Sequence, residues 1–220
     1  MTKDHLITLK DARSPAAEAF RTLRTNLIFA GLERPLQALV VTSAAPESDE
    51  AAGKSLILAN LAVVMAQGGR KTTLVDCDLR RPRQHEIFGA PVAPGFSDWM
   101  TGRDETPPRL VPTGVEGLAL LPAGSATAAP ADLLSSRRLP QLIAHLKAGA
   151  DMVLFDAPPL LAVSDAALLA ASLDGALLAV RAGHTRRDHA QRAKELLEKI
   201  GVRVVGAVLT NAAGDTLGAY

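Results

Sequence analysis

The sequence predicts an α/β protein with a doubly wound, mostly parallel sheet that carries helices on both faces. Short apolar runs alternate with longer helical patterns from residue 37 to residue 210; they read ALVV, TTLV, MVLF, ALLAV and VVGAVL. Near-continuous Val, Leu and Ala are typical of strands that are buried on both faces. Such a sheet binds its ligand at the carboxyl ends of the strands, which is where the polar residues of this chain collect.

Length and composition indicate one globular domain over residues 1–220. The chain is 48% hydrophobic with a net charge of +1, which fits a sizeable core and gives no sign of a nucleic-acid partner. The single cysteine, Cys77, excludes a disulfide framework, and the five histidines lack metal-ligand spacing. No signal-peptide or membrane-spanning pattern is present, so we expect a cytoplasmic protein.

The first expected element is a helix over residues 14–31. Ser14 is a suitable N-cap and Pro15 suits the first helical position. The apolar side of the helix consists of Ala16, Phe20, Leu23 and Leu27. A charged stripe beside it, which we expect to face away from the core, consists of Glu18, Arg21 and Arg24. Taken alone, this stripe predicts a solvated face with an i, i+3 salt bridge.

The remaining elements follow as alternating strands and helices. Strands are expected at residues 37–44, 71–77, 117–122, 150–157, 175–181 and 202–210. Helices are expected at residues 54–67, 136–147, 164–172 and 185–200. The Pro- and Gly-rich stretch 89–135 is expected to be one long excursion with short helices at most, and residues 212–220 form a short tail.

The turn between the first strand and its helix has the form of a phosphate-binding loop. A small, acidic segment ends in Gly53-Lys54-Ser55, which opens the helix. Backbone N–H groups at a helix N-terminus, a lysine and a hydroxyl together hold a triphosphate and Mg²⁺. The match is partial, because Ser48 stands where the pattern has glycine and acidic residues surround it: Glu47, Asp49 and Glu50. Taken alone, Gly-Lys-Ser is also compatible with an ordinary helix start.

Two further strand ends carry carboxylates. Asp76 and Asp78 lie at the tip of one apolar strand with Cys77 between them, and Asp156 closes the strand MVLF before a stiff Ala-Pro-Pro turn. An acidic residue that ends a hydrophobic strand is the usual Mg²⁺-holding half of a nucleotide site of the P-loop type. Each carboxylate alone could be a helix cap. Together with Gly-Lys-Ser on a third strand of the same sheet, they favour a nucleotide site.

Several segments give the chain a family resemblance along nearly its whole length. They read SPAAEAFRTLRTNL, GKSLILANLAVVMAQGGRK, LVDCDLRRPRQHEIFG, GLALLPAG, PADLL and MVLFDAPPLLAVSDA. With these segments, the chain resembles the cytoplasmic catalytic domain of bacterial tyrosine kinases. These are capsular and exopolysaccharide chain-length regulators related to the MinD and ParA ATPases. The resemblance implies a P-loop NTPase fold and a cytoplasmic domain that a partner recruits to the inner face of the membrane.

The resemblance also implies roles for individual residues. The nucleotide-binding residues are Ser48, Ala52, Gly53, Lys54, Ser55 and Asn211, where Asn211 sits at the adenine position. The Mg²⁺-holding residues are Ser55, Asp76 and Asp156. The catalytic residues are Lys54, Asp76 and Asp78, with Asp76 or Asp78 accepting the tyrosine proton. The Glu18, Arg21 and Arg24 stripe becomes the E-x-x-R-x-x-R motif that builds a ring-like homo-oligomer.

Two departures from the family pattern keep three functions open. The phosphate loop is about four residues longer than usual, and Tyr220 stands alone where the family has a phosphorylated tyrosine cluster. The first function is an ATP-dependent protein-tyrosine autokinase with Mg²⁺ as cofactor and Tyr220 as phosphoacceptor. The second is a degenerate homologue that assists a membrane polysaccharide copolymerase. The third, a ParA- or MinD-like partitioning ATPase, is disfavoured because it needs a lysine at the position of Asp49.

Overall fold

The computed structural model of the chain describes residues 3–44, 51–102 and 106–212. The strands are β1 Ala38–Ser43, β2 Thr72–Asp76, β3 Val111–Pro112, β4 Leu118–Leu121, β5 Met152–Asp156, β6 Gly175–Arg181 and β7 Val204–Thr210. The helices of the first half are η1 Lys3–His5, α1 Ile7–Lys10, α2 Pro15–Glu33, α3 Ala51–Gln67, α4 Gln84–Phe88 and α5 Phe96–Thr101. Those of the second half are α6 Pro130–Leu134, α7 Arg138–Gly149, α8 Asp165–Ala170 and α9 Arg187–Lys199.

The described strands form one seven-stranded sheet in the order β3-β4-β2-β5-β1-β6-β7. All neighbouring pairs are parallel except β3 and β4, which are antiparallel. The predicted doubly wound, mostly parallel sheet is therefore confirmed. β3 was not predicted, because a strand of two residues has no periodicity to detect.

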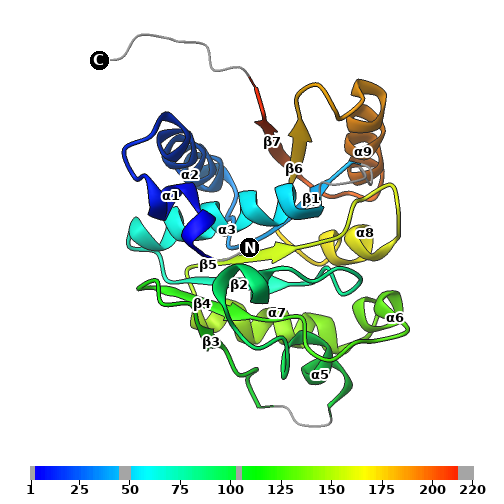
Figure 1. The fold of residues 1–220 in the computed structure, drawn as a ribbon. Helices are drawn as coiled ribbons and strands as arrows, with labels where there is room; N and C mark the ends of the chain where they lie inside the picture. Colours follow the sequence, from blue (N-terminus) through cyan, green and yellow to red (C-terminus); the bar gives the residue numbers. More distant parts are fainter. Residues whose placement is uncertain (1–2, 45–50, 103–105, 213–220) are drawn as a thin grey trace.

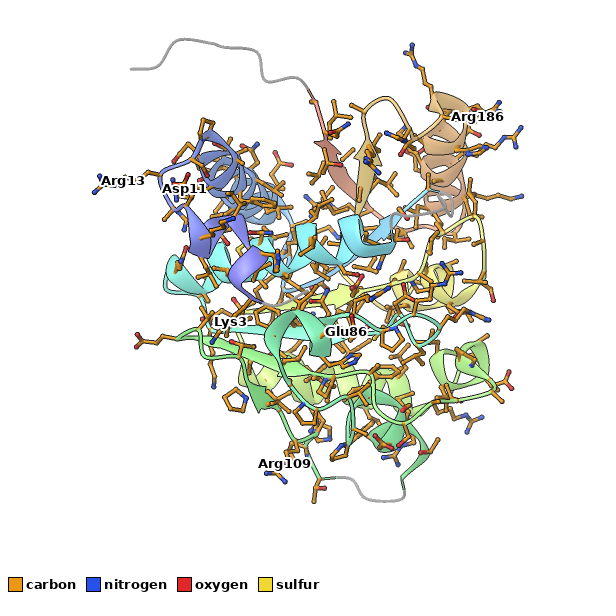
Figure 2. All side chains as sticks on the ribbon, viewed as in Figure 1. Lys3, Asp11, Arg13, Glu86, Arg109 and Arg186 are labelled. Atoms are coloured by element: carbon orange, nitrogen blue, oxygen red, sulfur yellow. The ribbon has the colours of Figure 1, made fainter. Side chains whose placement is uncertain are left out.

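Helices cover both faces of the sheet (Figure 1). Alternate residues of β1 point to opposite sides, so Leu39 and Val41 join the core beneath α1 to α4, whereas Ala38 and Val40 join the core beneath α5 to α9. Two separate apolar layers thus enclose the central strands. The charged residues labelled at the periphery in Figure 2, among them Arg13, Arg109 and Arg186, point outward.

The N-terminal region differs from the prediction. We expected the first ordered element at Ser14, but η1 and α1 precede α2. Leu6 is completely buried, and Thr8 donates hydrogen bonds from its backbone N–H (3.1 Å) and its hydroxyl (2.9 Å) to Asn60 Oδ1 on α3. A helix of four residues is too short to show in the sequence, because its stability comes from these contacts rather than from helix propensity.

The helix after β1 also begins earlier than predicted. The sequence placed its start at residue 54, whereas α3 begins at Ala51, so that Gly53 and Lys54 lie within its first turn. Among the described segments, no helix has both the length and the apolar character that crossing a membrane requires.

Candidate functional site

Three of the predicted strand ends meet at one edge of the sheet. β5 lies between β1 and β2, with Val41 opposite Asp156 on one side and Asp76 opposite Asp156 on the other. All three strands are parallel, so their carboxyl ends point the same way. The first turn of α3 follows β1 in the chain and brings Lys54 to this edge, as its contacts with Asp78 and Asp156 show.

Lys54 is a buried cation between two carboxylates. Its side chain is 2% exposed; Nζ donates to Asp156 Oδ1 and lies 3.5 Å from Asp78 Oδ2. Burial alone would lower the pKa of Lys54, but the charges of Asp156 and Asp78 outweigh it and raise the pKa above its ordinary value. The lysine therefore stays charged and compensates the buried carboxylates.

Asp76 is held by backbone N–H groups. Its Oδ2 accepts hydrogen bonds from the N–H groups of Arg83 (3.0 Å) and Gln84 (2.9 Å), and its Oδ1 accepts one from the N–H of Asp78 (3.3 Å). The side chain is fully buried. Burial first, and then the neighbouring charge of Asp156, raises the pKa of Asp76 to about 8. Both oxygens thus fix the segment between β2 and α4.

Asp78 turns one oxygen toward the lysine. Its Oδ1 accepts from the backbone N–H of Arg81 (3.1 Å), while Oδ2 is the atom near Lys54 Nζ. Burial raises the pKa of Asp78 despite the lysine. Asp78 therefore accepts fewer hydrogen bonds from the backbone than Asp76 does, and one of its oxygens faces the lysine.

Cys77, between the two aspartates, has a structural role in the sheet. Its backbone N–H donates to the carbonyl oxygen of Asp156 (2.9 Å), which extends the pairing of β2 with β5 by one residue. Burial raises the pKa of the Cys77 thiol well above its ordinary value. A buried, protonated thiol is not a nucleophile.

Gln84 was not among the predicted site residues. Its side chain is fully buried at the start of α4, where Nε2 donates to Asp156 Oδ2 (2.7 Å) and to the carbonyl oxygen of Ser55 (3.1 Å). The amide thus links α4 to β5 and α3. Nothing in the local sequence distinguishes this glutamine from a surface one, since it carries no charge and ends no strand.

An ion pair beside the site was also missed. Arg80 donates to both oxygens of Asp165, with distances of 2.8 Å from Nε and 3.2 Å from Nη2. The Asp165 side chain is fully buried at the start of α8, whereas that of Arg80 is 44% exposed. The pair connects the β2–α4 segment to α8, so it fixes the loop that follows Asp78.

The charged stripe of α2 only partly matches its prediction. The expected i, i+3 salt bridge between Glu18 and Arg21 is present at 2.7 Å. Arg24, however, does not face away from the core: its Nη1 donates to the carbonyl oxygen of Val64 near the end of α3 (2.9 Å), beside Gly68. The 100° spacing placed Arg24 beside the apolar stripe but could not show that α3 ends within its reach.

Other predicted site residues lie elsewhere. Ser48 and Tyr220 fall outside the described residues, and of Ala52 only the backbone position in α3 is described. Asn211 follows the edge strand β7, with β6 between that strand and β1, and has a left-handed φ of 54° that asparagine tolerates. The structure therefore brings together Lys54, Ser55, Asp76, Asp78 and Asp156.

The chemistry of this group suits a Mg²⁺-nucleotide. Carboxylate and hydroxyl oxygens are the ligands that Mg²⁺ prefers, and Mg²⁺ usually takes only one or two of them from the protein. No cluster of three or more potential metal ligands from His, Cys, Asp and Glu occurs in the described parts of the chain. A Cβ built on Gly53 meets no described atom within 4 Å, so the first turn of α3 leaves space for a close approach.

A comparison with protein families gives one match across most of the chain. Residues 48–219 match the model of the CobQ/CobB/MinD/ParA nucleotide binding domain. This segment includes all the residues that meet at the sheet edge.

Individual relatives point to the same family. The tyrosine-protein kinase YwqD of Bacillus subtilis (strain 168) is 36% identical over 205 residues, which are 93% of this chain and 85% of the relative. The putative tyrosine-protein kinase CapB of Staphylococcus aureus is 33% identical over 208 residues, which are 94% of this chain and 90% of the relative. The solved kinase domain of the Escherichia coli tyrosine kinase ETK superposes with a TM-score of 0.87 at 32% identity, covering 98% of this chain and 83% of that domain.

Proposed function

This chain belongs to the bacterial tyrosine-protein kinases, within the CobQ/CobB/MinD/ParA nucleotide-binding domains, and on that premise we propose that it transfers the γ-phosphoryl group of ATP to tyrosine. Its targets include copies of itself, and the reaction regulates capsular or exopolysaccharide synthesis and export. The observation that carries the proposal is the buried Lys54 between Asp78 and Asp156 at the carboxyl edge of the sheet.

Each residue of the site has a distinct task in this proposal. Lys54 and the first turn of α3 bind the phosphates, and Ser55 and Asp156 hold Mg²⁺, which neutralises phosphate charge when bound. Asp78 accepts the proton of the tyrosine hydroxyl, while Asp76 fixes the backbone that carries Asp78. Most of the rate then comes from positioning and charge compensation rather than from covalent chemistry.

Lys54 changes partners in this proposal. Its ammonium compensates Asp156 and Asp78 in the described arrangement. If Asp156 held a divalent cation, its charge would be compensated without the lysine, and Lys54 would be able to contact the phosphates. The buried carboxylates are then never left without a positive partner, a condition that burial of charge imposes.

The partners follow from the family and from α2. We propose a ring-like homo-oligomer built through α2, and a membrane polysaccharide copolymerase or adaptor that recruits this cytoplasmic domain to the inner face of the membrane. Exposed Phe29 and Leu32, which are 62% and 75% exposed near the end of α2, support a contact surface on this helix.

Two sequence features support a second candidate function. The altered phosphate loop and the single tyrosine, Tyr220, favour a degenerate homologue that binds nucleotide weakly or not at all and acts as an assembly partner of the copolymerase. Titration calorimetry with Mg²⁺-ATP separates the two candidates, because the kinase requires binding and the assembly partner does not.

The first prediction concerns Lys54. We expect Lys54→Ala to weaken Mg²⁺-ATP binding about ten- to a hundredfold, because a charge-assisted contact to phosphate is lost. Isothermal titration calorimetry measures the change.

Lys147→Ala is the matched control for this prediction. It also removes a lysine–aspartate pair, Lys147 to Asp174 at 3.0 Å, but Asp174 contacts the amino end of β1, opposite the site. Thermal melting shows whether each variant folds. If Lys54→Ala folds and binds ATP as tightly as the Lys147 control, the loop is not the nucleotide site.

A further inference from the structure

Gln84 is an uncharged side chain buried among the charged groups of the site. Its backbone N–H donates to Asp76 Oδ2, and its side-chain Nε2 donates to Asp156 Oδ2 and to the Ser55 carbonyl oxygen. One residue therefore contacts the ends of β2 and β5 and the first turns of α3. Neither the proposed chemistry nor the sequence motifs assign it a task.

The contacts fix the orientation of the amide. Both partners of Nε2, a carboxylate oxygen and a carbonyl oxygen, are pure acceptors, so the nitrogen must face them. Oε1 consequently points away from these two atoms. It is buried and has no hydrogen-bond donor among the residues that the structure describes.

A buried acceptor without a donor has a cost. Leaving such a group unsatisfied costs about 1–3 kcal/mol, so it calls for an explanation in a folded protein. The two hydrogen bonds from Nε2 supply one, because they hold the amide in this orientation although Oε1 is left without a donor.

Gln84 also controls one oxygen of Asp156. Lys54 donates to Oδ1 and Gln84 donates to Oδ2, so the carboxylate is held from both sides. When Lys54 turns to the phosphates, the Gln84 contact is what keeps the carboxylate plane in place. Hydrogen bonds to metal-ligating carboxylates have this orienting effect in other metal sites.

We propose that Gln84 is a positioning residue for Mg²⁺: through its Nε2 donation it orients Asp156, the carboxylate that holds the metal in the proposed site. This inference rests on the proposed nucleotide site. It predicts that Gln84 matters for the metal-dependent part of nucleotide affinity and not for the metal-free part. A glutamine that only joined α3 to the sheet would affect both parts alike.

The test compares ADP affinity in excess Mg²⁺ with ADP affinity in EDTA, by calorimetry. We expect Gln84→Met to weaken Mg²⁺-ADP binding about ten- to a hundredfold, with the affinity in EDTA unchanged. Gln84→Leu also removes the Nε2 donor and adds no charge, so it should show the same selective loss. It also serves as the second variant if Gln84→Met does not fold.

Two further variants define the mechanism. Gln37→Met is the matched control: Gln37 also donates through Nε2, to the carbonyl oxygens of Lys147 and Ala150 at the opposite edge of the sheet, and its loss should leave both affinities unchanged. Asp156→Asn should reproduce the Mg²⁺-selective loss. The double variant with Gln84→Met should lose no more than Asp156→Asn alone, because Gln84 acts through Asp156.

Each outcome decides the question. Equal losses with and without Mg²⁺, full additivity in the double variant, or no loss in either Gln84 variant would overturn the role of Gln84. An absence of ADP binding by the parent protein would instead overturn the proposed nucleotide site, and the positioning role with it.

Discussion

Asp76 is a carboxyl group whose ionisation opposes folding. Burial, followed by the charge of Asp156, raises its pKa to about 8. An unfolded aspartate loses its proton near pH 4, about four units lower. Between these two pH values the unfolded chain binds fewer protons than the folded chain, so the free energy of unfolding falls as pH rises. The contribution of Asp76 to stability is therefore fully present below about pH 4 and is lost as pH rises to about 8.

Asp76→Asn should therefore change the pH dependence of stability in a defined direction. The variant cannot ionise, so its free energy of unfolding relative to the parent should improve by a few kcal/mol between about pH 5 and about pH 8. Urea unfolding in EDTA at several pH values measures the difference. Parallel curves for the two proteins would contradict the raised pKa.

Asp174 should behave in the opposite way. It accepts hydrogen bonds from the backbone N–H groups of Gln37 (2.9 Å) and Ala38 (2.7 Å) and from Lys147. Burial would raise its pKa, but these contacts outweigh burial and lower it. The contribution of Asp174 to the free energy of unfolding is thus present above about pH 4 and is lost as pH falls through the lowered pKa.

The corresponding variant is Asp174→Asn. It should be less stable than the parent at neutral pH, by about 1–2 kcal/mol for a group that is partly exposed. The gap between the two proteins should close in acid, which thermal melts at several pH values will show. A gap that persists at low pH would mean that charge is not the cause.

At the residue scale, the sequence revealed the groups that carry charge at strand ends. Asp76 and Asp156 were recognisable because a buried strand that ends in a charge has few purely structural explanations, and Lys54 because it lies in the Gly-Lys-Ser run that opens a helix. Gln84 was not recognisable, because an amide gives no such signal. The Arg80–Asp165 pair was missed because its members are 85 positions apart, and only the packing of α8 brings them together.

At the scale of elements, α2 and α3 are joined by an arginine. Arg24 donates to the carbonyl oxygen of Val64 in the last turn of α3 (2.9 Å), which also accepts from the backbone N–H of Gly68 (3.1 Å). Its positive charge also lies at the negative end of the α3 dipole. Arg24 therefore contributes to the fold of the monomer, so we expect its charge reversal to affect folding as well as self-association.

Arg24→Glu should destabilise the monomer by about 1–2 kcal/mol, because it removes the cap and places a negative charge at the end of α3. Arg21→Glu should cost less, since its salt bridge to Glu18 is exposed. Thermal melting below the concentration of self-association measures both. Equal melting temperatures for Arg24→Glu and the parent would rule out the capping role.

The oligomer test should then use Glu18 and Arg21 rather than Arg24. We expect Arg21→Glu to reduce self-association in sedimentation velocity without unfolding the chain. The control is the double variant Glu18→Arg/Arg21→Glu, in which the two residues are exchanged. It restores the salt bridge within α2, so it separates loss of that bridge from loss of an oligomer contact. If Arg21→Glu sediments like the parent protein, Glu18 and Arg21 form only a solvated face and not an oligomer contact.

Elements of ordinary length were predictable, and very short ones were not. The six longer strands have apolar runs that persist over several residues, which a sheet buried on both faces demands. The short elements α1 and β3 depend on contacts with α3 and β4, respectively. The α1 contact joins residues 52 positions apart, and a strand of two residues is too short to show a period, so local patterns reveal neither element.

At the scale of the whole molecule, phosphorylation distinguishes the two candidate functions. Tyr220 is the only tyrosine, so any phosphotyrosine formed by self-reaction must lie there. The acidic loop with Ser48 in place of glycine should weaken the phosphate cradle, so we expect slow transfer between copies. Mass spectrometry after incubation with Mg²⁺-ATP measures it.

Variants make this measurement decisive. Under the kinase proposal, phosphate on Tyr220 should disappear in Asp78→Asn. Mixing a Lys54→Ala chain with a Tyr220→Phe chain tests whether one copy modifies another. A complete absence of Tyr220 phosphate in the parent protein would contradict the autokinase and favour the assembly partner.

The contact between Thr8 and Asn60 has a consequence for limited proteolysis. Asn60 lies on α3, the helix that begins beside the nucleotide site, and Leu6 fills a buried position against the same layer. A protease that removed residues 3–10 would uncover part of that layer and leave Asn60 without the donors from Thr8. A ligand that rigidifies α3 should therefore slow cleavage at the N-terminal end of the chain, far along the sequence from the loop it occupies.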